Sequence, residues 1–372
     1  MGKVCHITTV HQRYDIRIFQ KECKSLAKEG WDVTLIVHDS MPDQVVEGVK
    51  IISTKRERKN RIERMTKIPK VVFKIAIDVE ADIYHIHDPE LLPMAAKLHK
   101  CGKKVVFDSH EFTAKQILTK HYLPKISRKI LSKLYRSYES IVIRQIDGVI
   151  SPCMYNGEDY FEKDNENRAF INNYPFISIL DKNKKCEPNK KEQICYLGGI
   201  TKERGAVAMV KAVGIAKYPL ILAGGFSPSE MKYELEKEYG YQYVEYKGVV
   251  SHKEAVEIVK ESGIGFSVLQ NVGQYPYLHN LPTKVYEYMA AGIPVIISDF
   301  EYVRNVLEKY KFGIAVNPGD VEEIAEAIQK ISKDKELVYF MGEEGKRAVK
   351  EQFNWENDMK ILLDFYEKVI EK

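Results

Sequence analysis

The stretch from Asn280 to Asp299 contains residues whose types and spacing suit a bound phosphate group. Pro282 favours the first turn of a helix, because its backbone angle is already helical and the N–H it lacks would be unpaired there. Thr283 and Lys284 then lie in that first turn. Free N–H groups and the positive end of the helix dipole attract an anion at this position, and the lysine adds a full charge. These residues are therefore candidates for binding a phosphate.

Glu287 extends this pattern towards a sugar. It lies three residues after Lys284 and four after Thr283, so the three side chains share one face of the expected helix. A carboxylate can accept hydrogen bonds from sugar hydroxyls beside a phosphate, and a nucleotide diphosphate offers both groups. The same spacing fits an ordinary amphipathic surface helix with a Lys–Glu pair, and spacing alone favours that simpler interpretation.

The residues that follow predict the elements around this helix. Gly292 can adopt the left-handed conformation that ends a helix, and Pro294 prevents its continuation. Residues 295–297, Val-Ile-Ile, are a β-branched apolar run typical of a buried strand. The segment is thus predicted to form a loop, a short helix, a turn and a buried strand.

Strand-like segments alternate with helical ones along most of the chain. Strands are expected at residues 3–10, 32–39, 49–54, 82–88, 104–110, 148–153 and 168–174, and then at 194–198, 220–223, 244–248, 264–269, 295–298 and 314–316. Such alternation predicts parallel sheets with helices on both faces, in a doubly wound α/β fold. At 372 residues the chain exceeds what one core usually serves, so we expect two domains.

A loss of hydrophobic periodicity and a rise in charge mark residues 176–192 as a linker. The expected organisation is a first domain over residues 1–175, the linker over 176–192, a second domain over 193–352 and a final amphipathic segment over 353–372.

Polar residues follow the carboxyl ends of the expected strands, where ligands bind in open α/β sheets. In the second half Gly198 and Gly199 form a turn without side chains that lets the backbone approach a phosphate, and Arg204 follows this turn. A solvated surface position remains the alternative for Arg204.

In the first half, such residues follow three strands: His11, Asp15 and Arg17, then His85, His87 and Asp88, then Asp108, His110 and Glu111. His110 is the candidate for chemistry, with an ordinary hydrogen-bonded histidine as the alternative. We expect His85 and His87 to point to opposite faces of their strand, so that at most one of them can face a ligand.

Composition excludes several classes of protein. The hydrophobic fraction of 44% and the charged fraction of 30% are ordinary for a globular protein, and no apolar run approaches the ~18 residues of a membrane span. The first ten residues resemble a strand more than a signal peptide, which indicates a cytoplasmic protein. The six cysteines are scattered without a C-x-x-C pair or a histidine at metal-ligand spacing, so we expect free thiols and no metal at these residues.

The net charge of +4 is unevenly distributed, because residues 1–170 carry 30 basic and 23 acidic residues while the remainder carry 27 and 30. Two basic stretches, residues 55–74 and 115–136, account for much of this difference. Solvated helix faces are the default interpretation. The apolar and basic mixture of residues 123–134 also fits a helix on an anionic membrane surface, whereas no nucleic-acid motif accompanies the charge.

Taken together, these segments resemble the retaining glycosyltransferases of group 1 (family 4), which have the GT-B fold. The resemblance is carried by residues 281–295 (Leu-Pro-Thr-Lys-Val-Tyr-Glu-Tyr-Met-Ala-Ala-Gly-Ile-Pro-Val), 196–200, 204–205, 222–225 and 353–355, and in the first half by 11–19, 108–111 and 173–175. It implies two Rossmann-like domains facing a cleft, the first binding the acceptor and the second a nucleotide sugar. The last helix is expected to cross back to the first domain.

The resemblance also implies roles for individual residues. Arg204 and Lys284 would contact the donor diphosphate and stabilise the charge on the leaving group without a metal or other cofactor. Glu287 would hold the ribose. The loop of residues 247–250, which includes the donor-binding residue Val250, would pack on the base with backbone hydrogen bonds. His110 would touch the donor sugar. Gly198, Gly199, Thr283 and His279 complete the donor-binding residues expected from the match.

The chain departs from the family pattern at two places. His279 occupies the position, eight residues before Glu287, where the family often has a first glutamate. The glycine pair after the first strand is replaced by residues 10–17, in which Asp15 and Arg17 are expected to line the cleft for acceptor or phosphate.

The expected reaction is transfer of a sugar, with retention, from a UDP- or GDP-linked donor to a hydroxyl group of a glycan or lipid-linked glycan during polysaccharide assembly. The enzyme would be of the hexosyltransferase type, with a possible peripheral contact at the inner face of the cell membrane. A nucleotide-sugar epimerase of the same fold and an inactive nucleotide-sugar-binding relative are the alternatives.

Overall fold

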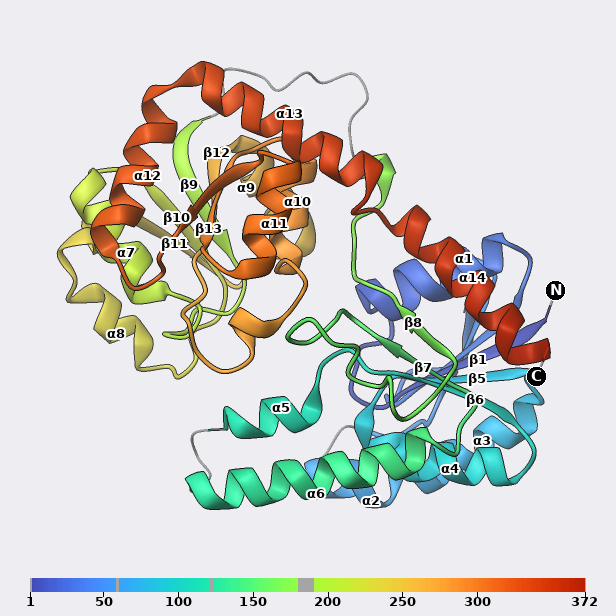
Figure 1. The fold of residues 1–372 in the computed structure, drawn as a ribbon. Helices are drawn as coiled ribbons and strands as arrows, with labels where there is room; N and C mark the ends of the chain where they lie inside the picture. The colour runs from blue at the N-terminus through green and yellow to red at the C-terminus, as the bar shows by residue number, and fades with distance from the viewer. Residues whose placement is uncertain (1, 58–59, 121–123, 180–190, 372) are drawn as a thin grey trace. The chain divides into compact units, whose positions relative to one another are not determined.

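The computed structural model describes residues 2–57, 60–120, 124–179 and 191–371. The chain folds into two α/β units (Figure 1), unit 1 with Met1–Asn173 and Asn357–Lys372 and unit 2 with Tyr174–Glu356. Residues 180–190 of the predicted linker lie outside the described residues, and the last part of that prediction, from Lys191, already belongs to a strand.

Unit 1 is built on an eight-stranded sheet with the order β3-β4-β2-β1-β5-β6-β7-β8. Its strands are β1 (Lys3–Thr8), β2 (Asp32–Val37), β3 (Gln44–Val46), β4 (Val49–Ser53), β5 (Ile83–Ile86), β6 (Lys104–Asp108), β7 (Gly148–Ser151) and β8 (Arg168–Phe170). All neighbours are parallel except β3 and β4. The sequence analysis predicted the parallel strands and missed β3, a three-residue edge strand too short to show a periodicity.

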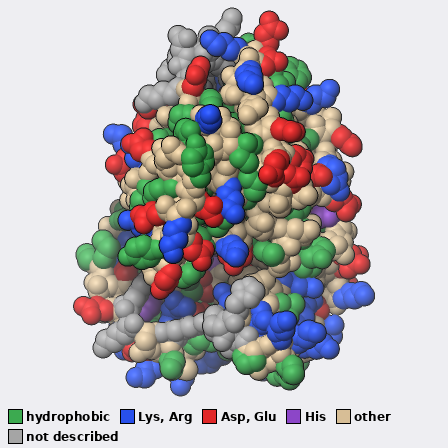
Figure 2. All heavy atoms as spheres, turned by 90° about the vertical axis from the view of Figure 1, so that its left-hand side faces the viewer, with side chains coloured by type: hydrophobic (Ala, Val, Ile, Leu, Met, Phe, Trp, Pro, Cys, Tyr) green, Lys and Arg blue, Asp and Glu red, His purple; other side chains and the backbone are tan. Residues whose placement is uncertain are grey.

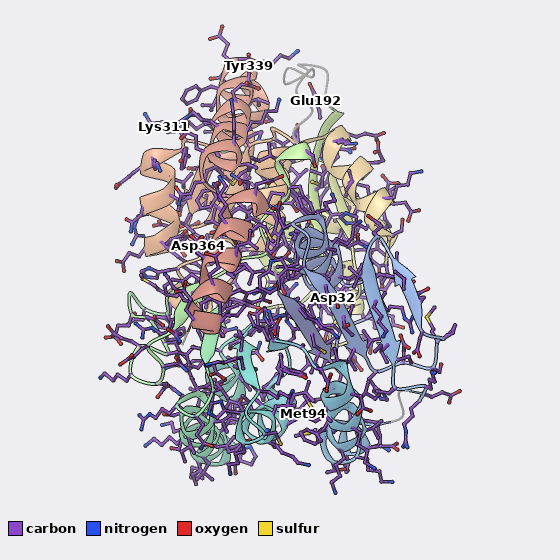
Figure 3. All side chains as sticks on the ribbon, turned by 90° about the vertical axis from the view of Figure 1, so that its right-hand side faces the viewer. Asp32, Met94, Glu192, Lys311, Tyr339 and Asp364 are labelled. Atoms are coloured by element: carbon purple, nitrogen blue, oxygen red, sulfur yellow. The ribbon has the colours of Figure 1, made fainter. Side chains whose placement is uncertain are left out.

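Helices cover both faces of this sheet, as the βαβ pattern predicts (Figure 1). They are the π-helical segment η1 (Ile16–Cys23), α1 (Lys24–Lys28), α2 (Arg61–Thr66), α3 (Ile68–Val79), α4 (Leu92–Lys100), α5 (Thr113–Leu118) and α6 (Lys125–Ile143). Apolar side chains of α3 and α4, such as Val72 and Met94, pack in the core with Ile7 and Ile86. Met94 on α4 can be seen in Figure 3.

The last helix, α14 (Trp355–Glu371), contributes to the core of unit 1. Phe365 and Tyr366 are buried, while Asp364, which precedes them in the helix, is exposed (Figure 3). A Cβ on Gly148 would lie only 2.6 Å from the Phe365 ring, so β7 and α14 pack at a distance that a glycine permits.

Unit 2 has a fully parallel six-stranded sheet with the order β11-β10-β9-β12-β13-β14. Its strands are β9 (Lys191–Leu197), β10 (Leu220–Ala223), β11 (Val244–Gly248), β12 (Ser262–Ser267), β13 (Val295–Ser298) and β14 (Gly313–Val316). Glu192 lies near the start of β9 (Figure 3). Together the two sheets confirm the predicted fold class.

Two helical layers enclose this sheet. The helices are α7 (Ala206–Ala216), α8 (Met231–Glu236), α9 (His252–Glu261), α10 (Thr283–Ala290), α11 (Glu301–Lys309), α12 (Val321–Lys333) and α13 (Lys335–Glu351). Successive strand residues alternate between two cores: Ile194 and Tyr196 pack with residues of α7 and α12, whereas Cys195 and Leu197 pack with residues of α10 and α11. The sheet is therefore covered on both faces, and ligands of such sheets bind at the carboxyl ends of the strands.

Candidate functional site

Two cations converge on the glycine turn that follows β9. Gly198 has a φ of +123°, and its N–H donates to the carbonyl of Ala223 over 2.9 Å. A Cβ on Gly198 would lie 3.5 Å from both Arg204 Nη1 and Lys284 Nζ. The structure therefore brings together Gly198, Gly199, Arg204 and Lys284, which the sequence analysis grouped as phosphate-binding residues. We call these four residues the cationic cradle.

The Lys284 ammonium is held in an unusual environment. It projects from the first turn of α10, and Nζ lies 3.5 Å from the centroid of the Tyr196 ring, a cation–π contact. Nζ is buried and has no hydrogen-bond partner within the described residues. Burial, and to a lesser degree the Arg204 charge, lowers the pKa of Lys284 well below its usual value. A buried ammonium without a hydrogen-bond partner is unfavourable, and a bound anion would supply that partner.

Arg204 is positioned by the loop between β9 and α7. Its backbone N–H bonds to Thr201, and its guanidinium interacts with the hydroxyl groups of Tyr196 and Tyr275. The next residue, Gly205, has a φ of +79°, and a Cβ there would lie 2.0 Å from the carbonyl oxygen of Val268. The loop thus packs directly on the chain after β12, which fixes the direction of the Arg204 side chain.

A further glycine closes the floor of the cradle. Gly224 follows β10 with a φ of +144°, and a Cβ there would lie 1.9 Å from the carbonyl oxygen of Gly198. The Tyr196 hydroxyl donates to the carbonyl of Gly199 over 2.8 Å. Backbone and aromatic rings therefore set the shape of the turn, and side chains supply the charge.

The other residues predicted to bind the donor have fewer contacts with the cationic cradle. Thr283 and Glu287 lie on α10 with Lys284, and the Glu287 carboxylate is near enough to counteract the fall in the pKa of Lys284. Val250 packs at the edge of the second core. His279 packs on the Tyr302 ring with centroids 5.5 Å apart, and within the described residues it has no hydrogen bond, ion pair or ring contact with the cradle.

In unit 1, the predicted His110 lies just beyond β6. Its Nε2 is 3.1 Å from Asp108 Oδ2 and 3.1 Å from His87 Nδ1, and its ring is 4.9 Å from the His11 ring. Asp108 is fully buried, and its pKa is lowered well below the usual range, chiefly because Arg17 and His110 outweigh the effect of burial. A buried carboxylate that accepts from Nε2 orients the imidazole and leaves Nδ1 for another partner.

Asp15 lies beside His11, whose ring is next to that of His110. The Asp15 carboxylate caps η1 by accepting from the N–H groups of Arg17 and Ile18, and it lies 3.3 Å from His11 Nδ1. These hydrogen bonds lower the pKa of Asp15 despite its partial burial. The Asp15 side chain is about one quarter exposed, so it is accessible from solvent.

Arg17 occupies a different place from the one expected. It was expected to line a cleft, but its guanidinium lies in the interior, with Nη2 at 2.7 and 2.8 Å from the Asp108 carboxylate and Nε at 3.0 Å from Glu22 Oε1. The reason is the π-helical winding of η1, in which the Gln20 N–H bonds to the carbonyl of Asp15 five residues earlier. This winding turns both Arg17 and Glu22 inwards, which an α-helical pattern does not predict.

The prediction that His85 and His87 point to opposite faces was wrong. Residues two apart on a strand share a face, and the two rings are stacked with centroids 4.5 Å apart. His6 is paired with His85 across β1 and β5, so its ring joins them at 4.5 Å from His85. Burial lowers the pKa of all three histidines, which favours their neutral forms.

Sequence reasoning missed two tyrosines that contact the cationic cradle. Tyr196 contacts both Lys284 and Arg204, and Tyr275, on the short 3-10 helix at residues 275–277, contacts Arg204. Tyr196 could have been found, because it is in the strand that ends at the glycine pair and its face is set by the alternation. Tyr275 is 71 residues from Arg204 in a region without periodicity, and nothing in the sequence indicates the contact.

None of the five described cysteines forms a disulfide bond, as predicted; they are Cys5, Cys23, Cys101, Cys153 and Cys195. Cys186 lies outside the described residues. Within the described residues, no helix combines the length and apolar character needed to cross a membrane.

Two largely parallel α/β sheets, with a cationic and glycine-lined turn at the carboxyl end of one of them, are features shared by many α/β proteins that bind phosphate groups. Two family models match the chain, "Glycosyltransferase Family 4" over residues 4–167 and "Glycosyl transferases group 1" over residues 179–348. The chain therefore belongs to the group 1 glycosyltransferase family.

Individual proteins agree with this assignment. An uncharacterized glycosyltransferase from Methanocaldococcus jannaschii is 26% identical over 208 residues, so the match spans 52% of this chain and about half the length, 50%, of that relative. Sucrose-phosphate synthase from Thermosynechococcus elongatus has a similar structure, with a TM-score of 0.79, 16% identity and full coverage of both chains. HepE from Anabaena, solved with UDP and glucose, has a TM-score of 0.70 with 12% identity over 99% of this chain and 100% of its own. These two structures establish the GT-B fold.

Proposed function

We propose that this protein transfers a sugar from a nucleotide-diphosphate sugar to a hydroxyl group of a glycan or lipid-linked glycan, with retention at the anomeric carbon. The proposal is carried by the buried Lys284 Nζ, which has no hydrogen-bond partner within the described residues and faces the same glycine turn as Arg204. The diphosphate of a donor would provide the anion that this pair of cations requires.

The chemical step requires that negative charge be stabilised on the departing diphosphate. Arg204 and Lys284 would supply this stabilisation in place of a metal at the diphosphate, and Glu287 would hold the ribose of the donor. The backbone at Gly198 and Gly199 can approach the phosphates closely because no Cβ intervenes. We assign His110 to the donor sugar, because its Nε2 is bound to the buried Asp108 and its ring is consequently oriented. The donor class we favour is UDP- or GDP-linked hexose, as HepE was solved with UDP and glucose.

The acceptor we favour is a membrane-linked glycan, and α6 supports this choice. Exposed apolar side chains recur every three or four residues on one face of α6: Ile126, Ile130, Leu134, Tyr138 and Ile141. The same helix carries five basic residues and a single acid, the buried Glu139. In Figure 2, Lys and Arg side chains gather beside hydrophobic ones in the lower part of the molecule. An anionic lipid surface would attract these charges and cover the apolar face.

A transfer assay tests the proposed reaction. The full chain is incubated with UDP-glucose, GDP-mannose and other nucleotide sugars, with and without short glycan acceptors, and released nucleoside diphosphate is measured. We expect release that depends on an acceptor, and a fall in kcat/KM of about 10²-fold or more for Lys284→Ala and Arg204→Ala. Lys260→Ala, a surface change in the same unit, is the control and should leave the rate unchanged.

Each alternative gives its own outcome in this assay. A changed sugar without any acceptor would indicate an epimerase. Saturable binding of donor without release of nucleotide would indicate an inactive nucleotide-sugar-binding relative. This alternative is based on His279, which occupies the position of the family's glutamate. Normal turnover of Lys284→Ala would remove the role that we assign to the cradle.

A further inference from the structure

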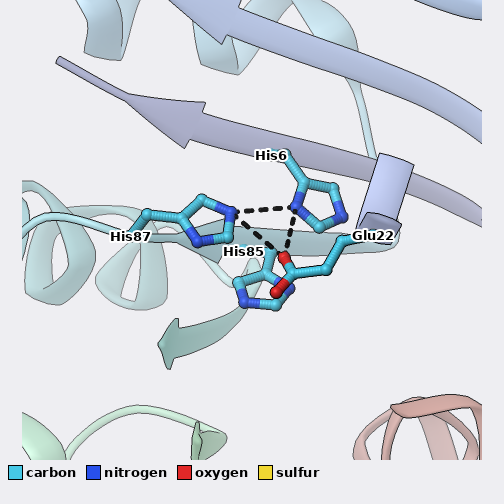
Figure 4. A group of neighbouring side chains, drawn as sticks. All are labelled: His6, Glu22, His85 and His87. Carbon is cyan, nitrogen blue, oxygen red and sulfur yellow. Dashed lines mark hydrogen bonds and ion pairs between the residues drawn. The ribbon is translucent and has the colours of Figure 1, made fainter. Parts of the chain in front are cut away.

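Four side chains with metal-binding atoms gather in the interior of unit 1, away from the cationic cradle. They are His6 on β1, Glu22 on η1, His85 on β5 and His87 just after β5 (Figure 4). All four are at most 1% exposed, and their ligand atoms lie within 4.8 Å of one another. The register explains part of this arrangement, because His6 and His85 are direct partners on neighbouring strands.

Three of these atoms form a triangle of suitable size. His6 Nδ1 is 2.9 Å from His87 Nε2, and Glu22 Oε2 is 3.6 Å from His6 Nδ1 and 3.7 Å from His87 Nε2 (Figure 4). Tetrahedral zinc binds nitrogen and oxygen at about 2.0–2.1 Å, which places its donor atoms about 3.3 Å apart. The three distances lie on either side of that value, so one zinc ion fits between the donors with small side-chain movements.

Two polar atoms of the cluster have no hydrogen-bond partner. Glu22 Oε2 and His85 Nε2 are both buried and make no hydrogen bond within the described residues, although His85 Nε2 lies 3.6 Å from Asp108 Oδ2. Arg17 Nε bonds to the other oxygen of Glu22, so it leaves Oε2 directed at the histidines. Buried polar atoms are rarely left unsatisfied, and an ion bound between these residues would satisfy both.

The surroundings of the cluster favour coordination by the inner nitrogens. His6 Nε2 is 3.3 Å from the Tyr366 hydroxyl, and His87 Nδ1 is 3.1 Å from His110 Nε2 and 3.4 Å from Asp108 Oδ2. Protons on these two outer nitrogens leave lone pairs on His6 Nδ1 and His87 Nε2, which face each other. Carboxylate and hydroxyl partners of this kind orient the histidines of known metal sites.

The types of side chain in the cluster also indicate which metal it would bind. Three imidazoles and one carboxylate are ligands that suit zinc and related transition metals and do not suit magnesium or calcium.

We propose that His6, Glu22, His85 and His87 bind one zinc ion in a closed structural site that connects β1, η1 and β5. Four protein ligands leave no position open for a substrate, so the ion stabilises unit 1 and takes no part in the diphosphate chemistry. The site is independent of the proposed function, and the two can be tested separately.

Metal binding by the full chain, without nucleotide, tests this proposal. The purified protein is treated with a chelator, exchanged into metal-free buffer and titrated with Co²⁺, with Zn²⁺ as competitor and Mg²⁺ as control. We expect one equivalent of Co²⁺ to bind with the intense visible absorption of a four-coordinate ion, to be displaced by Zn²⁺, and to raise the melting temperature. A folded chain that binds neither Co²⁺ nor Zn²⁺ stoichiometrically would overturn the proposal and leave a hydrogen-bonded histidine cluster.

Two variants of matched size locate the site. Glu22→Gln and His87→Gln should weaken Zn²⁺ binding at least tenfold, while His99→Gln, a histidine paired with Asp147 elsewhere in unit 1, should bind as the wild type does. Far-ultraviolet circular dichroism checks that each variant is folded. Unchanged binding by folded Glu22→Gln would contradict the ligand set. Lys284→Ala should bind zinc normally, which separates this result from any failure of the donor site.

Discussion

At the scale of single residues, the candidate site residues of the two units differ in the sign of the charge that they bury. Lys284 is a buried cation whose ammonium has no hydrogen-bond partner within the described residues, whereas Asp108 is a buried anion held by Arg17 and His110. The sequence indicated Lys284 through its place after Pro282, because helix starts have recognisable residues. It could not indicate the burial of Arg17, because the π-helical winding that turns this residue inwards has no known sequence signal.

The lowered pKa of Lys284 predicts that donor binding takes up a proton. A diphosphate beside Nζ favours the charged ammonium and raises the pKa, so affinity should fall as the pH rises between the free and bound values. Isothermal titration of the nucleoside diphosphate in buffers of different ionisation enthalpy measures this uptake. Lys284→Met, which keeps most of the length of the side chain and removes the amino group, should show less uptake than the wild type. Equal uptake in both proteins would mean that Lys284 is already charged before the ligand binds.

A second prediction concerns Asp358 on α14. Burial raises its pKa to about 7, although the Asn172 N–H and the charges of Arg17 and Lys21 act in the opposite direction. The folded chain therefore keeps the proton at pH values where the unfolded chain has lost it, so stability should fall by about 2–4 kcal/mol as the pH rises from about 4 to about 7. In Asp358→Asn, which can still accept from Asn172, urea unfolding of unit 1 should lose this part of its pH dependence. An unchanged pH profile would show that Asp358 is ionised in the folded chain.

At the scale of elements, glycines at the ends of strands allow backbone segments of unit 2 to approach one another. The sequence analysis predicted that Gly198 and Gly199 form a bare turn after β9, and the structure places two cations over it. It also predicted the parallel strands from their alternation with helices. What it could not predict was which distant side chain completes the turn: Tyr275 reaches Arg204 from a segment without regular periodicity.

Gly224→Ala tests the packing of this floor. Its positive φ of 144° and a Cβ only 1.9 Å from the Gly198 carbonyl oxygen predict a loss of about 2–4 kcal/mol in the stability of unit 2. The melting temperature and the affinity for nucleotide should both fall. Gly319→Ala is the matched control, because its nearest neighbour would be 3.5 Å away, and it should unfold as the wild type does. A Gly224→Ala protein of normal stability would show that the turn can move without cost.

At the scale of the whole molecule, the chain combines two α/β units of similar architecture with different charges and different candidate ligands. The family and the fold were predicted from the order of motifs along the chain, and the comparisons confirm them. The buried histidine cluster of unit 1 was not predicted, because it depends on the register of β1 against β5 and on the winding of η1. Such pairings arise from the folded chain and leave no local pattern.

Membrane attachment is a property of the whole molecule. We predict it from the exposed apolar and basic side chains of α6. Sedimentation with liposomes at low salt should recover more protein with anionic vesicles than with neutral ones, and recovery should fall as salt screens the charges. Changing Ile130 and Leu134 together to Glu should reduce the recovery, since both are more than half exposed. Val45→Glu, an exposed apolar residue of β3, is the control. Equal recovery from both kinds of vesicle would argue against a lipid surface as a partner.

The central claim is that the cationic cradle binds the diphosphate of a nucleotide sugar, and thermal unfolding with UDP, GDP, ADP or CMP tests it most directly. At a hundred times its dissociation constant a ligand stabilises the folded state by about 2.7 kcal/mol, enough for a clear rise in melting temperature. We predict that one diphosphate stabilises the wild type and Lys260→Ala equally, and that Lys284→Ala loses the effect. Stabilisation of Lys284→Ala equal to that of the wild type would contradict the account, because the ligand would then be bound elsewhere.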